Sequence, residues 1–263
     1  MRVTISTDSL STRIVVFFAV LLVLVQGLAF GLVKTANSQI ARDTIEAELG
    51  VGERIFRRLL DQNREQLEQS ATLLASDFAF RQAVGTRDRA TVLSVLSNHG
   101  ARAQAGVMLL VSLDQTVLAD TLHPEAKPAP FAFPQLTQDA AQHGKSAGIA
   151  VIDGRLYQLV VVPVLAPTTI AWVAVGFDID DQNAGDLKKL TALDVSFLSR
   201  RTGGPWSLHA TTLDEKQRSH LAPAVLDRDF GKASVDMEMS GDMFEARFAR
   251  LEKQGDTEVV AVL

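Results

Sequence analysis

The sequence predicts an α+β protein with an N-terminal transmembrane helix, a long stalk helix and two tandem modules built on antiparallel sheets. Three observations predict this fold class: an uncharged apolar run near the N-terminus, a long proline-free helical pattern behind it, and two later segments that share one order of strands and a short helix. We expect a cytoplasmic N-terminus at 1–13, the transmembrane helix at 14–33, the stalk and a following helix at 34–103, a membrane-distal module at 104–179, a connecting helix at 180–193 and a membrane-proximal module at 194–263.

The apolar run at 14–33 contains no charged side chain. At 1.5 Å per residue it spans about 30 Å, the thickness of the hydrocarbon core of a bilayer. Arg2 and Arg13 precede it, and this slight excess of positive charge favours a cytoplasmic N-terminus. A cleaved signal peptide is the alternative, but the run is long for one, and a helical pattern continues directly beyond it. With either reading, the residues after Lys34 are expected outside the cytoplasm.

The stalk helix is predicted over about 35–83, where apolar residues recur at spacings of four and seven: Ile45, Leu49, Phe56, Leu60, Leu67, Leu74 and Phe78. Such a helix buries one stripe of its surface. We expect the stripe to contact a second copy of the chain near the membrane and the chain's own modules further along. The stalk therefore predicts a homodimer. A shorter helix is expected at about 87–103.

The first module shows the order β-β-α-β-β-β. We expect strands at 106–113, 116–120, 146–152, 155–165 and 169–179, a proline-rich loop at 123–134, and a short helix at 134–144. Asp153-Gly154 is a strong signal for a two-residue hairpin, because both central positions of a type I′ turn need a positive φ.

The second module shows the same order, although the two segments share no clear residue identity. We expect strands at 194–200, 206–211, 231–239, 243–251 and 257–263, with a helix in 213–226 that ends before Pro223. The hairpin turn at Ser240-Gly241-Asp242 is the expected counterpart of Asp153-Gly154. Each module has roughly 80 residues, near the lower limit for a stable domain, so mutual packing is expected to support both.

Composition excludes several classes of function. A formal net charge of −5 argues against a broad nucleic-acid surface, so no nucleic-acid partner is expected. The chain has no cysteine, which rules out disulfides and thiolate chemistry. The five histidines lack the spacing of a zinc hydrolase, and no serine stands in a nucleophile elbow. We therefore expect no metal, no cofactor and no catalytic residue, and we do not expect an enzyme.

The segment "GKSAGIAVIDGRLYQLVVVPVLAPTTIAWVAVGFDIDDQNAGDLKKLTALDVSFLSR" at 144–200 resembles the double Cache (PAS-like) sensor domain of bacterial receptors. The resemblance extends loosely from Lys34 to Leu263. It implies a periplasmic domain anchored in the inner membrane, which binds an amino acid, carboxylate or similar metabolite in its membrane-distal module.

The resemblance also implies an output in the cytoplasm. The candidates are a histidine kinase, a chemoreceptor, or a diguanylate cyclase or phosphodiesterase of c-di-GMP signalling. In sequence pattern, the segment most resembles the sensor domains of GGDEF/EAL proteins. We expect the chain to be a fragment of such a receptor, because it stops within a predicted strand, before any second membrane helix.

Candidate ligand contacts lie on the strands of the first module. Arg155 and Tyr157, the only tyrosine, share one face of strand 155–165, and Trp172 and Asp178 share one face of strand 169–179. In amino-acid-binding Cache modules an aspartate at the position matched by Asp178 holds the ligand amine, although the arginine-aromatic cluster that grips the carboxylate there has no counterpart here. The rim is expected to comprise Arg102, Asp120, His123 and Lys145.

Each of these residues also has a purely structural reading. Tyr157 fits a half-buried sheet aromatic, Asp178 fits a helix cap, and the rim residues fit ordinary surface positions. Our first hypothesis is a ligand-sensing domain. The alternative is a periplasmic protein-interaction module without a small-molecule pocket.

Overall fold

The computed structural model describes residues 10–86, 88–226, 230, 234–254 and 256–263. The chain divides into two compact units, Met1–Glu48 and Leu49–Leu263. Helix α1 (Leu10–Ser76) contributes to both units, and all other elements belong to the second. In the part of the chain that is described, no helix has the length and apolar character needed to cross a membrane, so the span expected at 14–33 is not found; residues 1–9 of the expected cytoplasmic segment lie outside the described residues.

The predicted unbroken stalk is wrong at its C-terminal end. Helix α1 stops at Ser76, and two shorter helices follow, α2 (Phe78–Thr86) and α3 (Arg89–Ala103). Asp77 starts α2, because its carboxylate accepts a hydrogen bond from the backbone N–H of Phe80 at 2.8 Å. Asp88 caps α3 in the same way, accepting from the N–H of Thr91 at 3.0 Å.

The first module, residues 107–178, is built on one antiparallel sheet of six strands in the order β3-β2-β1-β6-β5-β4. The predicted strands are present, and a short additional strand lies in the proline-rich loop. The elements are β1 (Val107–Val111), β2 (Thr116–Asp120), β3 (Ala129–Pro130), α4 (Pro134–His143), β4 (Ser146–Ile152), β5 (Arg155–Leu165) and β6 (Thr169–Asp178).

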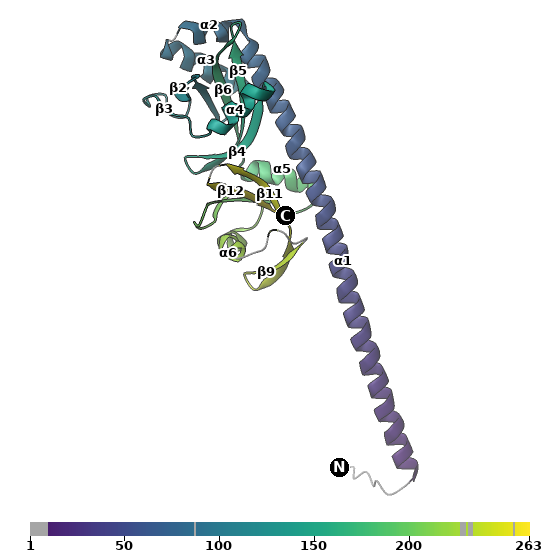
Figure 1. Cartoon of the computed structure of the whole chain (residues 1–263). Coiled ribbons are helices and arrows are strands. Elements are labelled where there is room, and N and C mark those ends of the chain that lie inside the picture. Colours follow the sequence, from purple (N-terminus) through teal and green to yellow (C-terminus); the bar gives the residue numbers. More distant parts are fainter. Residues whose placement is uncertain (1–9, 87, 227–229, 231–233, 255) are drawn as a thin grey trace. The chain divides into compact units, whose positions relative to one another are not determined.

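Helices cover both faces of this sheet (Figure 1). One face packs on the C-terminal part of α1 and on α2 and α3, with Leu67, Phe80 and Leu96 buried against the strands. The other face packs on α4 and on the loop before it, where Leu136 and Phe131 are buried. Alternation along each strand sends successive side chains to these two cores.

The second module, residues 196–262, has a four-stranded sheet in the order β11-β12-β7-β8 and a separate hairpin, β9 with β10. The elements, with the connecting helix α5 before them, are α5 (Asp181–Thr191), β7 (Ser196–Arg201), β8 (Ser207–Thr211), α6 (Glu215–Val225), β9 (Val235–Met239), β10 (Asp242–Ala246), β11 (Phe248–Gln254) and β12 (Thr257–Val262).

Two predictions for the second module are wrong. The single strand expected at 243–251 is two strands, because the chain changes partner near Arg247: β10 pairs with β9, and β11 pairs with β12. The helix expected to end before Pro223 continues to Val225. Pro223 lies in the last turn, where its missing N–H costs the helix only one hydrogen bond.

The two hairpin turns are counterparts, as predicted. Asp153 and Gly154 have φ angles of 50° and 78°, and Ser240 and Gly241 have φ angles of 56° and 89°. Positive φ at both central residues is the geometry of a type I′ turn. Each turn joins a directly paired couple of residues, in the first hairpin Ile152 with Arg155.

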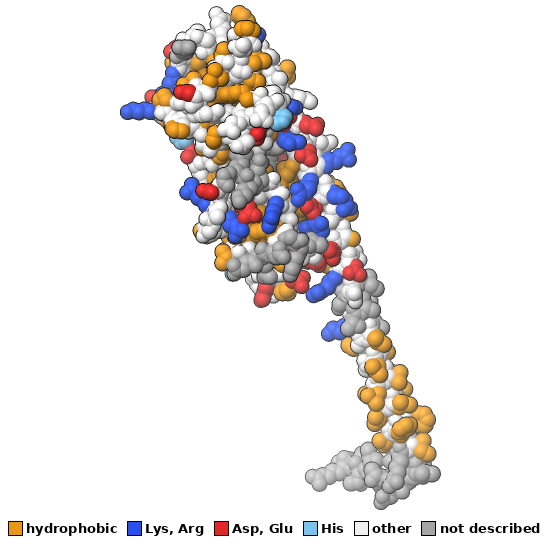
Figure 2. Space-filling view, viewed as in Figure 1, with side chains coloured by type: hydrophobic (Ala, Val, Ile, Leu, Met, Phe, Trp, Pro, Cys, Tyr) orange, Lys and Arg blue, Asp and Glu red, His pale blue; other side chains and the backbone are white. Residues whose placement is uncertain are grey.

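The two modules share a core. Phe56 of α1, Leu156 of β5, Ala184 of α5 and Phe197 of β7 are buried in one cluster. A second cluster fills the opposite face of the second sheet under α6. On the face shown in Figure 2, basic and acidic side chains are interspersed, in keeping with the mild net charge of the chain.

Candidate ligand site

A cavity of about 350 Å³ lies in the first module, between its strands and the loop of residues 121–133. We call it the loop cavity. Strand β2, the β4–β5 turn and the loop itself line it, and its walls are mostly apolar. Its charged lining residues are Arg89, Asp120, His123, Lys127 and Asp153. Cavities of this size hold small-molecule ligands in other proteins.

His123 ties the loop over this cavity to two strands. Its Nδ1 lies 3.0 Å from Oδ2 of Asp120 at the end of β2, and its Nε2 lies 3.1 Å from Oδ2 of Asp153 in the hairpin turn. The hydrogen bond and the charge of Asp120 raise the pKa of the imidazole above its usual value, with a smaller contribution from Asp153. The loop is therefore held by a histidine that favours its protonated form.

A buried tyrosine lies on the same sheet, outside the lining of the loop cavity. Tyr157 is fully buried and stands directly opposite Asp178 on the neighbouring strand. Among the described residues, its hydroxyl has no hydrogen-bond partner. Burial raises the pKa of this phenol, and the nearby Asp178 carboxylate raises it further. A buried hydroxyl without a partner is uncommon and indicates a position that a ligand or an ordered water can satisfy.

Close packing around Tyr157 depends on a glycine. A Cβ placed on Gly106 would lie 2.0 Å from Oδ2 of Asp178 and 3.0 Å from the tyrosine ring. Arg155 completes the arrangement: its Nη2 lies 2.6 Å from Oδ1 of Asp178, an ion pair without the alignment of a hydrogen bond, and its guanidinium carbon lies 5.7 Å from the centre of the Tyr157 ring.

Of the eight predicted site residues, five lie together. With Asp153 they form what we call the polar cluster: Asp120, His123, Asp153, Arg155, Tyr157 and Asp178.

The other three predicted residues lie elsewhere. Trp172 shares the predicted sheet face, but it is six residues before Asp178 on β6, or about 20 Å along the strand. Lys145 lies toward α1, where its Nζ is 2.5 Å from Oε2 of Glu68. Arg102 is exposed in the last turn of α3.

Sequence reasoning missed Asp153, Arg89 and Lys127. We assigned Asp153 only to the hairpin turn, although a polar turn residue next to a predicted strand end was a usable signal. Arg89 lies at the start of α3 and donates a hydrogen bond to the carbonyl of Ala126, so it also anchors the loop. Its link to the loop joins residues far apart in sequence, which no local pattern reveals.

Charged groups of both signs lie in and beside the loop cavity. In the polar cluster, three carboxylates face Arg155 and His123, so the cluster carries a net negative charge whether or not the imidazole is protonated. Arg89 and Lys127 supply positive charge elsewhere in the lining of the loop cavity. The residues that the structure describes contain no group of three or more acidic or histidine side chains placed to hold a metal ion.

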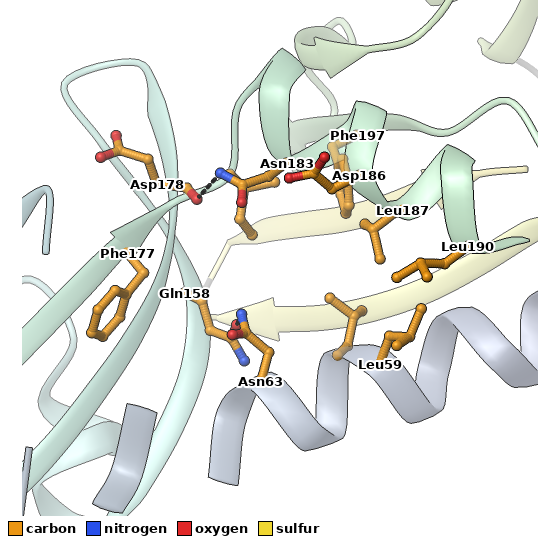
Figure 3. A pocket seen from close by; sticks show the side chains of 12 residues that line it. Leu59, Asn63, Gln158, Phe177, Asp178, Asn183, Asp186, Leu187, Leu190 and Phe197 are labelled. Atoms are coloured by element: carbon orange, nitrogen blue, oxygen red, sulfur yellow. Dashed lines mark hydrogen bonds between the residues drawn. The ribbon is translucent and has the colours of Figure 1, made fainter. Parts of the chain in front are cut away.

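The candidate site is also linked to the connecting helix. The backbone carbonyl of Asp178 accepts a hydrogen bond from Nδ2 of Asn183 in α5 at 3.0 Å (Figure 3). The next residue, Ile179, donates its N–H to the carbonyl of Leu156 at 2.8 Å. The end of β6 therefore presents its side chain to the polar cluster and its backbone to α5.

Comparison with known families identifies the class of domain. Residues 42–254 match the dCache_3 family, described as the double sensory domain of two-component sensor kinases. This match covers most of the chain, so the chain belongs to this family and is a sensory domain of the double Cache type. None of the curated proteins matches it in sequence.

Several solved structures are similar to this chain at low sequence identity. The sensor domain of the Vibrio cholerae histidine kinase DctB is 13% identical, with a TM-score of 0.53 over 85% of this chain and 97% of that one. A domain of a sensory box/GGDEF family protein from Vibrio parahaemolyticus is 11% identical, with a TM-score of 0.50 over 84% and 94%. The sensory domain of the Campylobacter jejuni chemoreceptor Tlp3, solved with isoleucine bound, is 10% identical, with a TM-score of 0.43 over 86% and 94%.

Proposed function

We propose that this sensory domain binds a small amphoteric metabolite, of the amino-acid class, in the loop cavity and against the polar cluster. The ligand's ammonium group faces the carboxylates of Asp120, Asp153 and Asp178. Its carboxylate faces Arg89 and Lys127. The observation that carries the proposal is the buried hydroxyl of Tyr157, which has no hydrogen-bond partner among the residues that the structure describes, beside a group of carboxylates with a net negative charge.

Signalling requires that the ligand bind two packings of the domain with different affinity. The hydrogen bond from Asn183 to the carbonyl of Asp178 supports a route from the ligand to α5 and the second module. We propose that residues 104–179 are the membrane-distal module, that residues 194–263 are the membrane-proximal one, and that the output is a cytoplasmic kinase, chemoreceptor or c-di-GMP enzyme outside this chain.

We further propose that the protein acts as a homodimer held at a bacterial inner membrane, with the modules in the periplasm. The uncharged run at 14–33 supports a membrane anchor. Exposed Val51 and Ile55 on α1 support a contact between two copies of this helix. Light scattering on the purified chain tests the dimer: Ile55→Glu is expected to give monomers, and unchanged dimers would reject this contact.

A thermal-shift screen of the full chain against the amino acids and small carboxylates tests the ligand. A compound at 100 times its Kd is expected to stabilise the fold by about 2.7 kcal/mol. Asp153→Asn should remove most of that shift, because asparagine keeps the turn geometry but not the charge. Asp242→Asn, at an exposed position of the matching hairpin, is the control and should leave the shift unchanged.

The same screen addresses the alternative. If no compound shifts the melting temperature, while a periplasmic extract yields a stable complex with the chain, then a protein-interaction module is the better description. If Asp242→Asn and Asp153→Asn weaken the shift equally, a ligand binds, but not at the polar cluster.

A further inference from the structure

A second cavity lies between α1, one end of the first sheet and α5 (Figure 3). Its volume is about 160 Å³, and we call it the junction cavity. It differs from the loop cavity in being lined from both modules and from α1. Its walls are mainly the apolar side chains of Leu59, Leu60, Phe177, Leu187, Leu190 and Phe197.

Two to three turns before the cavity, α1 packs closely on Leu193, which follows α5 in the chain. A Cβ on Gly52 would lie 2.1 Å from Cδ1 of this leucine. Further along α1, Leu59 and Asn63 line the cavity together with Leu187 and Leu190 of α5.

Polar residues also line the cavity: Asp178, Asn183 and Asp186 on the side of α5, and the amides of Asn63 and Gln158 at the end next to α1. Nδ2 of Asn63 donates a hydrogen bond to Oε1 of Gln158 at 3.0 Å, and the two amides face each other in Figure 3. Gln158 is 6% exposed. Within the described part of the chain, neither Nε2 of Gln158 nor Oδ1 of Asn63 has a hydrogen bond, although both residues line the cavity. A donor on Gln158 and an acceptor on Asn63 are thus left for a partner in the cavity.

We propose that the junction cavity is a second ligand site, for a small apolar molecule that carries one hydroxyl group. A cavity of roughly 150 Å³ holds benzene, so the space fits one ring or a branched chain of similar size. The hydroxyl accepts from Nε2 of Gln158 and donates to Oδ1 of Asn63. The apolar part packs between Leu59, Leu187 and Phe197. Such a ligand contacts α1 and both modules at once.

Benzyl alcohol is the probe, titrated into the full chain by calorimetry, with toluene as the partner compound without a hydroxyl. Leu190 is 62% exposed at the cavity, so Leu190→Trp should fill the space without disturbing the fold. We expect this variant to weaken the binding of benzyl alcohol and of toluene by about tenfold or more, because the added tryptophan ring occupies the space that the probe needs. Leu113→Trp, at a similarly exposed leucine of the first module, is the control and should bind both probes normally.

Gln158→Met tests the polar end. This variant should weaken the binding of benzyl alcohol by about fivefold, because one neutral hydrogen bond is lost. The binding of toluene should be unchanged. Denaturation curves confirm that the variant is folded. Equal effects on both probes would remove the amide pair from the proposal, and unchanged binding to Leu190→Trp would reject the site.

The proposals for the loop cavity and for the junction cavity can be tested independently. Tyr157→Phe should leave benzyl alcohol binding unchanged, and Leu190→Trp should leave any amino-acid shift unchanged. If Tyr157→Phe weakens benzyl alcohol, the probe binds in the first module, and the junction cavity is not the site.

Discussion

The two modules pack the same sheet face in opposite ways. In the first module, the face under α4 leaves a cavity, with a charged rim and a buried hydroxyl. In the second module, the face under α6 is filled: Phe230 lies 5.4 Å from Trp206 and 4.7 Å from Phe248 between ring centres. Arg200 covers Trp206 at 4.5 Å from its ring. Related sheets therefore leave a cavity in the first module and a packed face in the second.

The two modules also differ at single matching positions of their hairpins. The third residue after each type I′ turn is Tyr157 in the first hairpin and Phe244 in the second. The first residue is Arg155 in one and Asp242 in the other. A phenol and a guanidinium near Asp178 create polar recognition groups, whereas a plain phenyl ring adds only to the core. The comparison teaches that the two modules differ in what fills this face: a cavity with charged residues in the first, and packed aromatic rings in the second.

The largest expected effect comes from emptying the filled face. Trp206→Ala removes a ring buried against Phe230, so we expect it to lower the free energy of unfolding by about 3–5 kcal/mol. Phe131→Ala should cost clearly less, because the loop cavity beside Phe131 leaves part of this ring without packing contacts. Urea denaturation measures both. Equal costs would mean that the first face is as tightly packed as the second.

The next effect concerns the tight packing of the polar cluster. Gly106→Ala places a methyl group against the Asp178 carboxylate, and we expect a loss of about 1–3 kcal/mol in unfolding free energy. Gly185→Ala in α5 is the control, since a Cβ there meets nothing within 4 Å; alanine should stabilise this helix by up to about 1 kcal/mol. A neutral result for Gly106→Ala would show that Asp178 moves freely.

Much of the fold followed from local signals. Strands β2, β4 and β5 and helix α4 were predicted within a residue, because alternation and the Asp153-Gly154 turn define them locally. The break at Asp77 and the split near Arg247 were missed. The first depends on a single side-chain cap, and the second on a change of strand partner, which only the three-dimensional sheet reveals.

The candidate site was less predictable. Strand alternation alone selected Tyr157 and Asp178 as candidates, but their direct pairing across two strands was not predicted. Asp153 and Arg89 reach the loop cavity through tertiary contacts, and no sequence period brings them near Asp120. Lys145 was wrongly placed, because the residue lies just before the edge strand and its side chain pairs with Glu68 of α1.

A smaller effect separates the two hairpins. Tyr157→Phe removes a buried hydroxyl that lacks a partner among the described residues, so the ligand-free protein should gain up to about 1 kcal/mol in stability. Phe244→Tyr, at the half-buried matching position, should change stability by less than about 0.5 kcal/mol. If Tyr157→Phe destabilises the protein instead, an ordered water satisfies the hydroxyl and the cluster is hydrated before ligand binds.

The smallest effect is a pair of opposite pH dependences, one in each module. Asp120 raises the pKa of the exposed His123 above its ordinary 6.5, whereas burial lowers the pKa of His209, whose Nδ1 contacts the carbonyl of Gly154. The stabilisation from His123 is present below pH 6.5 and is lost as the pH rises through its raised pKa. That from His209 is present above pH 6.5 and is lost as the pH falls toward its lowered pKa.

NMR titration of the imidazole resonances, assigned with His123→Gln and His209→Gln, measures both pKa values. Asp153→Asn should lower the pKa of His123, because it removes one of the two carboxylates that face the ring, and it should leave His209 unaffected. If both histidines titrate near 6.5, His123 does not hold the loop over the cavity, and His209 is not held against the first hairpin. The loop cavity would then open freely at every pH, and the difference between the modules would rest on packing alone.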